Sequence, residues 1–409
     1  MSPAPSRSYA PSRSRAPLEA APASAAPSVP PWLLGDRAKR IVLAASAAAV
    51  VSFAWWALRS GADAEENAAP ASSPAKESRP VRPCTLSGEA RKLADAVHLG
   101  VPLALQQVGS GRVALGYAAS TTEAVGLTLD PMTLDAARAF SEGGSEKVLG
   151  VLPLSREDGR GGFATSRARK KSDNGGLVAL SAGLAHLSAG ERGLEVRLDG
   201  STELLWPGAA APQNTSPRAE PLGSSGALLT WRRGGLDGDI VVGLLDPRGL
   251  ARGSAAKIAS EAKEFGTPSP SVGEEEVLVT FASRSASDRP WRIELSRAPL
   301  GQLPATSRIF VPEGLSESAS TLSPAATALP GGGWLLQWTQ GENGKHRVWL
   351  QTLDHELAPV GPPLAAAPAD AESGQGIPWA GADRRAAAFY IVRAGQQWEL
   401  WGTALECPR

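Results

Sequence analysis

The chain has 409 residues, enough for one large domain or two ordinary ones. Its 41 basic and 41 acidic residues cancel, and no basic stripe offsets that balance, so nothing favours binding to nucleic acid. Gly contributes 44 residues and Pro 34, a share that is high for a helical protein and typical of many short strands joined by turns. We therefore expect an all-β fold.

The first segment, 1–40, consists mainly of Pro, Ala, Ser and Arg. It has too few large apolar side chains to offset the entropy of ordering a chain, so it is predicted to be a disordered tail. A proline-rich ligand for a partner domain is the alternative.

An uncharged apolar run follows, from Ile41 to Leu58. As a helix it would be about 27 Å long, close to the thickness of the hydrocarbon core of a membrane. Three positive charges precede the run (Arg37, Lys39 and Arg40) and Arg59 alone follows it. This asymmetry predicts a single-pass signal anchor with the N-terminus in the cytoplasm and the rest outside it. In a bacterium the membrane would be the inner membrane and the main domain would be periplasmic.

Two alternatives to a retained anchor are a buried core helix and a cleaved signal. The run shows no polar face, which argues against an ordinary core helix. Ala62-Asp63-Ala64 is a small-x-small triplet at a suitable distance for signal-peptidase cleavage, which would give a secreted protein. The run is longer than a usual signal core, so the retained anchor is favoured. Residues 59–83 are polar with scattered proline and are interpreted as a flexible linker.

The two cysteines of the chain, Cys84 and Cys407, bracket the region 84–409. An exported compartment permits disulfides, so the pair is predicted to be bonded, with two free thiols as the alternative. In the chain-entropy account, closing so long a loop stabilises by on the order of 5 kcal/mol.

Between the cysteines, an apolar strand leads through a polar turn to a second strand, and this pattern occurs six times. The pairs are Gly111–Tyr117 with Ala124–Asp130, Gly176–Ser181 with Leu194–Asp199, Gly226–Trp231 with Asp239–Asp246, Glu276–Phe281 with Pro290–Ser296, Gly333–Trp338 with His346–Asp354, and Arg385–Val392 with Gln397–Glu406. The second strands end at positions 130, 199, 246, 296, 354 and 406, in steps of 69, 47, 50, 58 and 52 residues. Repeats of this length with strands and turns are typical of a β-propeller.

Residue types within the repeats agree with stacked blades. Ile240–Val242 and Val277–Val279 are apolar at successive positions, so both faces of these strands need cover. We therefore predict a propeller of six blades over 84–409, with the Cys84–Cys407 bond sealing the ring. A β-sandwich or two small β domains is the alternative.

The repeat Gly333–Trp338, followed by Val348–Asp354 and Pro359–Pro363, resembles the divergent propeller repeats of exported bacterial proteins. It is similar in style to six-bladed propellers of the periplasmic Tol-associated kind. The resemblance covers about residues 100–406 and implies the fold only. The Ser-x-Asp-x-Gly box and the Gly-His with Trp-Asp pairing of other propellers are not found. Two segments depart from the strand pattern and are predicted to be short helices, Glu89–Val97 and Ser254–Phe265.

Three short motifs are similar to pieces of serine enzymes that recognise penicillin: Ser73-Pro-Ala-Lys76, Ser254-Ala-Ala-Lys257 and Ser172-Asp173-Asn174. The Lys-Thr-Gly element is missing and the order is wrong, so we interpret them as chance.

The sequence predicts no catalytic, cofactor-binding or metal-binding residue. His98, His186, His346 and His355 lack the spacing of metal ligands. Asp237-Gly238-Asp239 could offer two carboxylates to calcium, but Asp-Gly is a turn dipeptide and the rest of a binding loop is absent.

Twelve tryptophans stand out in the composition. Those in predicted strands could form a binding face, but packing between blades is the favoured interpretation. They are Trp231, Trp334, Trp338, Trp349, Trp398 and Trp401.

These observations predict a non-catalytic binding or scaffold module for an envelope protein or glycan, acting without a cofactor; the oligomeric state stays open. The alternative is a hydrolase or lyase with its site at the mouth of the propeller channel, and capture of a peptide at an open sheet edge is a third hypothesis. Paired carboxylates or a histidine–carboxylate pair at that mouth would favour the enzyme. A channel lined by small and apolar residues would favour binding.

Overall fold

The computed structural model describes residues 80–408, apart from 110, 156–160, 169–173, 191–192, 199, 207–216, 313–317, 343 and 384. Segments 1–40 and 41–58, the triplet at 62–64 and nearly all of 59–83 lie outside the described residues. In the described part, strands dominate, and the one helical element is the 3-10 turn η3, Gly223–Ser225. No helix found there has the length and apolar character needed to cross a membrane.

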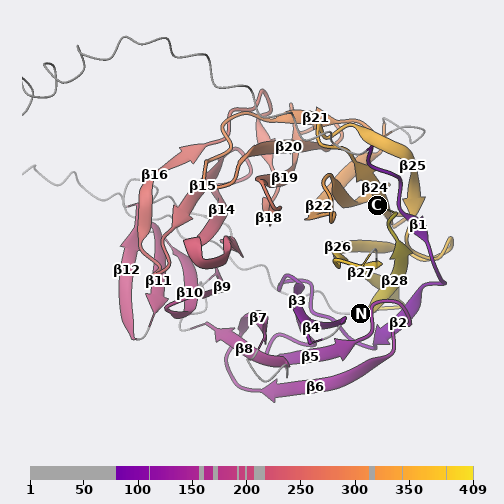
Figure 1. Cartoon of the computed structure of the whole chain (residues 1–409), viewed down its shortest axis with the longest axis horizontal. Coiled ribbons are helices and arrows are strands. Elements are labelled where there is room, and N and C mark those ends of the chain that lie inside the picture. Colours follow the sequence, from indigo (N-terminus) through magenta and orange to yellow (C-terminus); the bar gives the residue numbers. More distant parts are fainter. Residues whose placement is uncertain are drawn as a thin grey trace, which may run out of the picture. The chain divides into compact units, whose positions relative to one another are not determined.

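The strands of residues 78–409 form antiparallel sheets around a central axis (Figure 1). Five of these sheets, which we number as blades 1 to 5, are each built from one continuous stretch of sequence, and the strand nearest the axis is the first of the blade, except in blade 4, where it is the second, β18. Their strands are β3 (Ala104–Val108), β4 (Arg112–Ala118), β5 (Glu123–Leu129) and β6 (Ala136–Gly143) in blade 1; β9 (Asn174–Leu180), β10 (Gly183–Gly190), β11 (Gly193–Leu198) and β12 (Ser201–Leu205) in blade 2; β13 (Arg218–Pro221), β14 (Ala227–Arg233), β15 (Asp239–Leu245) and β16 (Ala251–Lys257) in blade 3; β17 (Glu264–Phe265), β18 (Ser269–Val272), β19 (Glu276–Arg284), β20 (Arg292–Pro299) and β21 (Arg308–Phe310) in blade 4; and β22 (Ser320–Ala328), β23 (Trp334–Gly341), β24 (Arg347–Leu353) and β25 (Pro359–Ala365) in blade 5.

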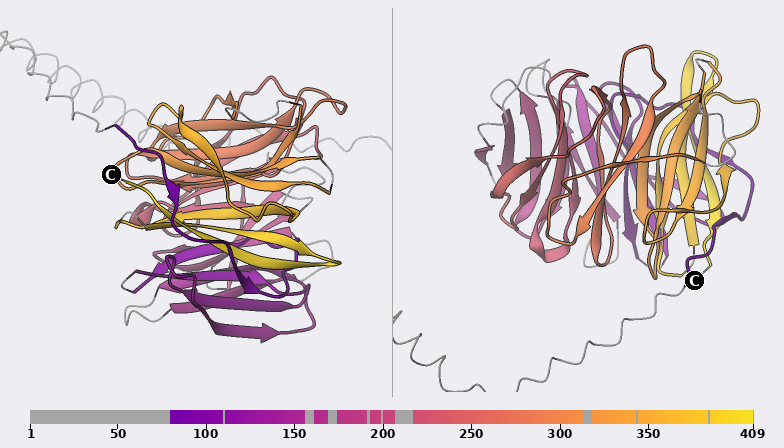
Figure 2. Two further views of the ribbon diagram at one scale, coloured as in Figure 1. Left: turned by 90° about the vertical axis from the view of Figure 1, so that its right-hand side faces the viewer. Right: turned by 90° about the horizontal axis from the view of Figure 1, so that it is seen from above.

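Blade 6 joins the two ends of the chain. Its C-terminal strands are β26 (Ser373–Ala380), β27 (Arg385–Ala394) and β28 (Gln397–Glu406), and the N-terminal strands β1 (Thr85–Leu86) and β2 (Arg91–Ala94) pair with the outer side of β28. Figure 2 shows the indigo N-terminal segment running beside the yellow strands of this blade. Cys84 and Cys407 form a disulfide next to the β1–β28 pairing. The predicted six-bladed propeller and its covalent closure are confirmed.

An additional hairpin lies between blades 1 and 2. It consists of β7 (Val148–Ser155) and β8 (Gly161–Arg167), and β7 contacts β3 on one side and β9 on the other. The Phe163 ring of the hairpin stacks on Phe140, with 5.5 Å between ring centroids, and covers Gly126. This hairpin accounts for the first step of 69 residues in the repeat, which is the longest of the five.

The hydrophobic core is divided among the junctions between neighbouring sheets. One cluster joins blades 2 and 3 around Trp231, and another joins blades 4 and 5 around Trp334 and Trp338. The central strands are covered on both faces, as predicted for Ile240–Val242 and Val277–Val279, since all six of these residues are buried. Stacking of blades therefore supplies the cover that a single sheet cannot supply. The remaining tryptophans in the predicted strands are half-buried: Trp349, Trp398 and Trp401.

Both predicted helices are wrong. Ser254–Phe265 contains the end of β16 and the short strand β17, because pairing of β16 with β15 overrides the helix preference of the alanine-rich Ser254–Lys257. Glu89–Val97 contains β2, which is recruited as an outer strand by β28.

The predicted strand pair of blade 2 was also incomplete. Gly176–Ser181 and Leu194–Asp199 correspond to β9 and β11, which are not neighbours because β10 lies between them. The sequence of β10, GLAHLSAG, has few of the bulky residues that mark a strand.

Candidate functional site

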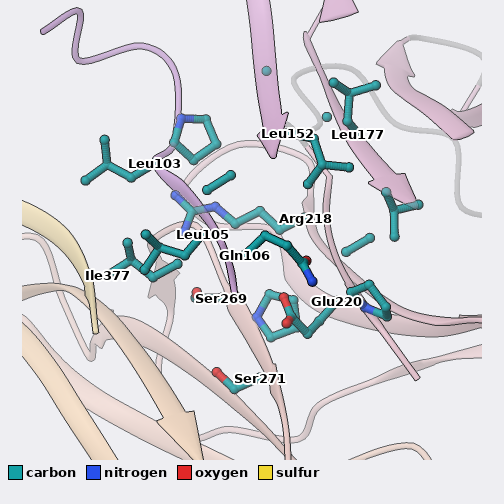
Figure 3. A pocket seen from close by; sticks show the side chains of 18 of the residues that line it. Leu103, Leu105, Gln106, Leu152, Leu177, Arg218, Glu220, Ser269, Ser271 and Ile377 are labelled. Atoms are coloured by element: carbon teal, nitrogen blue, oxygen red, sulfur yellow. The ribbon is translucent and has the colours of Figure 1, made fainter. Parts of the chain in front are cut away.

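The inner strands of the six blades and of the hairpin surround a central cavity of about 230 Å³. Most of its lining is small or apolar, with Leu105, Leu152, Leu177 and Ile377 among the larger side chains (Figure 3). Inner strands β18 and β22 add small residues, including Ser271, whose hydroxyl donates to the carbonyl of Ala326 at 2.7 Å. The wall is therefore largely without charge.

Two charged side chains interrupt this wall, Arg218 and Glu220. They occupy alternate positions of β13, and alternate residues of a strand point to the same side. Figure 3 shows both side chains reaching into the cavity, where the amide of Gln106 also points. Neither charge has a hydrogen bond or ion pair with a described residue, and they do not pair with each other. Two opposite charges thus face the cavity, and neither has a partner in the described part of the chain.

The surrounding ring changes the proton affinity of both groups. Desolvation lowers the pKa of the Arg218 guanidinium, which nevertheless stays charged at neutral pH. Desolvation raises the pKa of Glu220 to about 7. The Glu220 side chain is enclosed by the ring but remains open to the space at its centre, so water can still reach the carboxylate. Glu220 can therefore exchange a proton near neutral pH.

A second cavity, of about 250 Å³, lies where the inner strands begin; we call it the mouth cavity. It shares Arg218, Leu103 and Ile377 with the central cavity, so the guanidinium stands at the boundary between the two. Leu236, from the β14–β15 turn, and Trp291, from the β19–β20 connection, reach this cavity from the loops. Loops at one face of a rigid ring are where propellers usually place a binding site.

The indole of Trp291 is held in place by its neighbours. The Arg284 guanidinium lies over the ring, 4.6 Å from its centroid, and Glu264 accepts hydrogen bonds from Arg284 at 2.8 and 2.5 Å. An ion pair thus fixes the cation that covers the ring. Trp291 offers the mouth cavity an apolar surface of defined orientation.

Two non-glycine residues of the mouth cavity have left-handed backbone conformations. Ser323 has φ 48° and Gln375 has φ 36°, and each lies at a register shift of an inner strand, β22 and β26 respectively. Such conformations cost free energy of order 1–3 kcal/mol each and concentrate at functional sites. The bulges turn a hydroxyl and an amide to an exposed position at the mouth, where both can make hydrogen bonds to a ligand.

The residues singled out in the sequence do not meet at this site. The disulfide lies at the seam of blade 6, and Ser254 and Lys257 lie on the outer strand β16. Asp239 pairs with Arg233 and Lys257, each at 2.6 Å, at the end of a turn. Within the described ranges, no group of three His, Cys, Asp or Glu residues is placed to hold a metal ion.

The four histidines also lie apart from the two cavities. His346 approaches Glu372, with 3.9 Å between Nδ1 and Oε1, but neither residue lines a cavity. His186 contacts the Ser166 hydroxyl at 3.5 Å, and the His355 ring packs beside Gly332. His98 is half-buried.

A buried carboxylate elsewhere has a different character. Glu294, on β20, is 3% exposed and accepts hydrogen bonds from the hydroxyls of Ser260, Ser283 and Ser307. It lines neither cavity, and its donors come from three separate segments. The cluster therefore satisfies a buried charge and ties these segments together.

Sequence reasoning missed Arg218, Glu220 and Trp291. The Arg-Ala-Glu of 218–220 follows Pro217 and looks like a polar turn, because nothing local marks β13 as an inner strand. A usable signal was the position of these charges just before the strand Gly226–Trp231 of a repeat, where a propeller places its innermost strand.

No known family profile matches the chain, and no curated protein matches it. Among solved structures, a protein of unknown function from Dyadobacter fermentans is 12% identical, with a TM-score of 0.47, over 78% of this chain and 99% of that one. An α-L-arabinanase from Penicillium chrysogenum is 7% identical, with a TM-score of 0.49, over 79% and 98%. An α-L-arabinofuranosidase from Fusarium graminearum is 9% identical, with a TM-score of 0.49, over 78% and 98%. Nothing about ligand or activity follows from likeness at this level.

Proposed function

We propose that the propeller is a binding module whose ligand enters the mouth cavity and places an anionic group against Arg218. The observation that carries the proposal is the unpaired guanidinium at the boundary of the two cavities. A guanidinium with five donors and no partner among the described residues is suited to a carboxylate or phosphate. The ordered indole of Trp291 and the exposed Ser323 and Gln375 supply an apolar contact and polar contacts around it.

The lining of the channel supports binding over catalysis. Small and apolar residues dominate it, and among the described residues Glu220 is the one carboxylate that lines either cavity. Common hydrolytic chemistry on glycosides uses two carboxylates flanking the bond.

Binding of a simple carboxylate to the full chain in detergent tests the proposal. Hexanoate should bind and the neutral hexanamide should not, as followed by ligand-observed NMR. Arg218→Gln should weaken hexanoate binding about tenfold or more, since a charge-assisted hydrogen bond contributes about 1.5–3 kcal/mol. Arg252→Gln, on the exposed outer strand β16, is the matched control. Equal binding of acid and amide, or no effect of Arg218→Gln, would contradict the proposal.

We also propose that the module is displayed from a bacterial inner membrane by the segment Ile41–Leu58, with the propeller in the periplasm, where a group carried by an envelope protein or glycan can enter the cavity. The support is the apolar run, the charge asymmetry around it and the disulfide, a bond typical of exported proteins. A phosphatase reporter fused after Arg409 should be active outside the cytoplasm and remain with the membrane fraction. Release of the fusion into the soluble periplasm would instead favour cleavage near Ala64.

The second candidate function is a hydrolase or lyase with its site in the channel, and one observation favours it. Glu220, with its pKa raised to about 7, can act as a general acid or base at neutral pH, and Arg218 lies on the same wall. Turnover of an acidic glycan that is lost in Glu220→Gln, while binding survives, would establish the enzyme in place of the binding module.

A further inference from the structure

We infer that the ligand is bipolar: an amino-carboxylic acid whose carboxylate lies against Arg218 and whose ammonium lies farther from the mouth cavity, against Glu220. This inference rests on the proposed function and specifies the class of ligand. It starts from the placement of two opposite charges on one wall, both pointing into the same cavity (Figure 3).

The two charges lie at different positions along the channel. Arg218 lines both the mouth cavity and the central cavity, whereas Glu220 lines the central cavity alone. Their Cα atoms are about 6.6 Å apart along the strand at ordinary strand rise. A ligand entering from the mouth therefore passes the guanidinium before it reaches the carboxylate.

The charges do not neutralise each other. No ion pair joins them, and among the described residues they are the two charged groups that line the central cavity. A charge in a narrow cavity attracts a ligand group of the opposite sign more strongly than the same charge does in open water. A purely anionic ligand would satisfy Arg218 and bring its own charge toward Glu220, while a zwitterion satisfies both groups.

The wall around the charges suits an aliphatic spacer. Leu105 and Ile377 line the central cavity, as do Leu152 and Leu177 on the hairpin and blade 2 sides. Methylene groups between an ammonium and a carboxylate would contact these side chains and displace water from them. Gln106, which also points into the cavity, adds an amide that can accept a hydrogen bond from the ammonium.

A matched set of three probes tests the inference on the full chain in detergent: 6-aminohexanoate, hexanoate and hexylamine. Wild-type protein should bind 6-aminohexanoate about tenfold more tightly than hexanoate, because the ammonium gains a charge-assisted contact. Glu220→Gln should abolish this preference without weakening hexanoate, and Glu220→Asp should retain part of it. Glu203→Gln, on the exposed outer strand β12, is the control and should keep the full preference.

A second readout separates a direct contact from a general disturbance. Since the pKa of Glu220 is about 7, binding of the ammonium at pH 7 should release protons from the wild type, seen as a dependence of the binding enthalpy on the ionisation enthalpy of the buffer. This release should vanish in Glu220→Gln.

The outcomes distinguish the two levels of the proposal. If Arg218→Gln weakens hexanoate while Glu220→Gln leaves the preference for 6-aminohexanoate intact, the bipolar inference fails and the proposed function stands. Equal affinity of the wild type for hexanoate and 6-aminohexanoate would also contradict the bipolar inference and leave the proposed function intact. If neither acid binds, both the bipolar inference and the proposed function fail.

Discussion

Cys84 and Cys407 are covalently joined one residue away from the backbone pair Thr85 and Glu406, where the first strand of the domain meets the last. The strand β1 has only two residues, both exposed, so its own pairing contributes little to holding the seam. The disulfide is buried in the cluster between blades 5 and 6, and it fixes a junction that the rest of the ring makes by stacking.

Replacing both cysteines by serine should therefore lower the free energy of unfolding by about 2–5 kcal/mol, because an unfolded chain without the crosslink has more conformational freedom. Guanidinium denaturation of the purified full chain measures the change. Wild-type protein unfolded under reducing conditions is the control and should match the double variant. Equal stability with and without the bond would mean that pairing of β1 and β2 with β28 is sufficient.

The hairpin β7–β8 gives a second prediction, at Gly126. A Cβ added there would overlap the ring of Phe163, so Gly126→Ala should displace the ring and destabilise by about 1–3 kcal/mol. Combining it with Phe163→Ala should cost less than the sum of the single changes, because the clash is gone. Gly143→Ala, whose added Cβ meets nothing within 4 Å, should be close to neutral. Strict additivity in thermal unfolding would refute the contact.

A third prediction concerns the buried Glu294. Glu294→Gln replaces two acceptor oxygens by one and adds donors opposite three serine hydroxyls, so it should lower the free energy of unfolding by about 1–3 kcal/mol. Denaturation beside the exposed control Glu203→Gln measures this loss. A variant as stable as the wild type would show that the serines find other partners.

Glu220 predicts a pH dependence of stability. Its folded pKa of about 7 lies above the unfolded value of about 4.3, so between these values the folded state binds more protons than the unfolded state. The free energy of unfolding should then fall as pH rises from about 4.5 to 7, and Glu220→Gln should remove that fall. Water in the channel solvates the carboxylate and makes the effect smaller than full burial would.

The other charged group described on the same wall is Arg218, which stays protonated over this range, so it does not contribute to the slope. Denaturation curves at pH 5 and pH 8 test the point. At pH 5 the free energy of unfolding of Glu220→Gln should be similar to that of the wild type, and at pH 8 it should be higher. The reverse order would exclude a raised pKa of Glu220.

The sequence predicted the strands of the repeat correctly where both faces of a strand are covered by neighbouring blades. Five of the six predicted pairs are the two neighbouring middle strands of a blade, because residues such as Val277–Val279 must be apolar to pack between neighbours. The inner and outer strands were harder to find. β13 and β16 have exposed or half-buried residues throughout, and their conformation is set by pairing with neighbours rather than by local preference.

The site could not be predicted from the sequence, because it also depends on contacts between distant parts of the chain. Arg218 and Glu220 line the central cavity because closure of the ring brings β13 to the axis. In the sequence they are two charges in a proline-rich stretch, and no local pattern indicates that they face a cavity. Of the specific residue roles, the disulfide was predicted correctly, since two cysteines that bracket an exported domain are placed to bond.

The hairpin makes the channel wall unequal around its circumference. Blades of four or five strands approach the axis from every other direction, and at this one position the sheet has two strands. A ligand bound along the axis would therefore make different contacts in each rotational orientation, so these orientations would not be equivalent. The charges on β13 and the hairpin strand β7 line the same cavity, so the wall that faces a bound ligand is asymmetric about the axis.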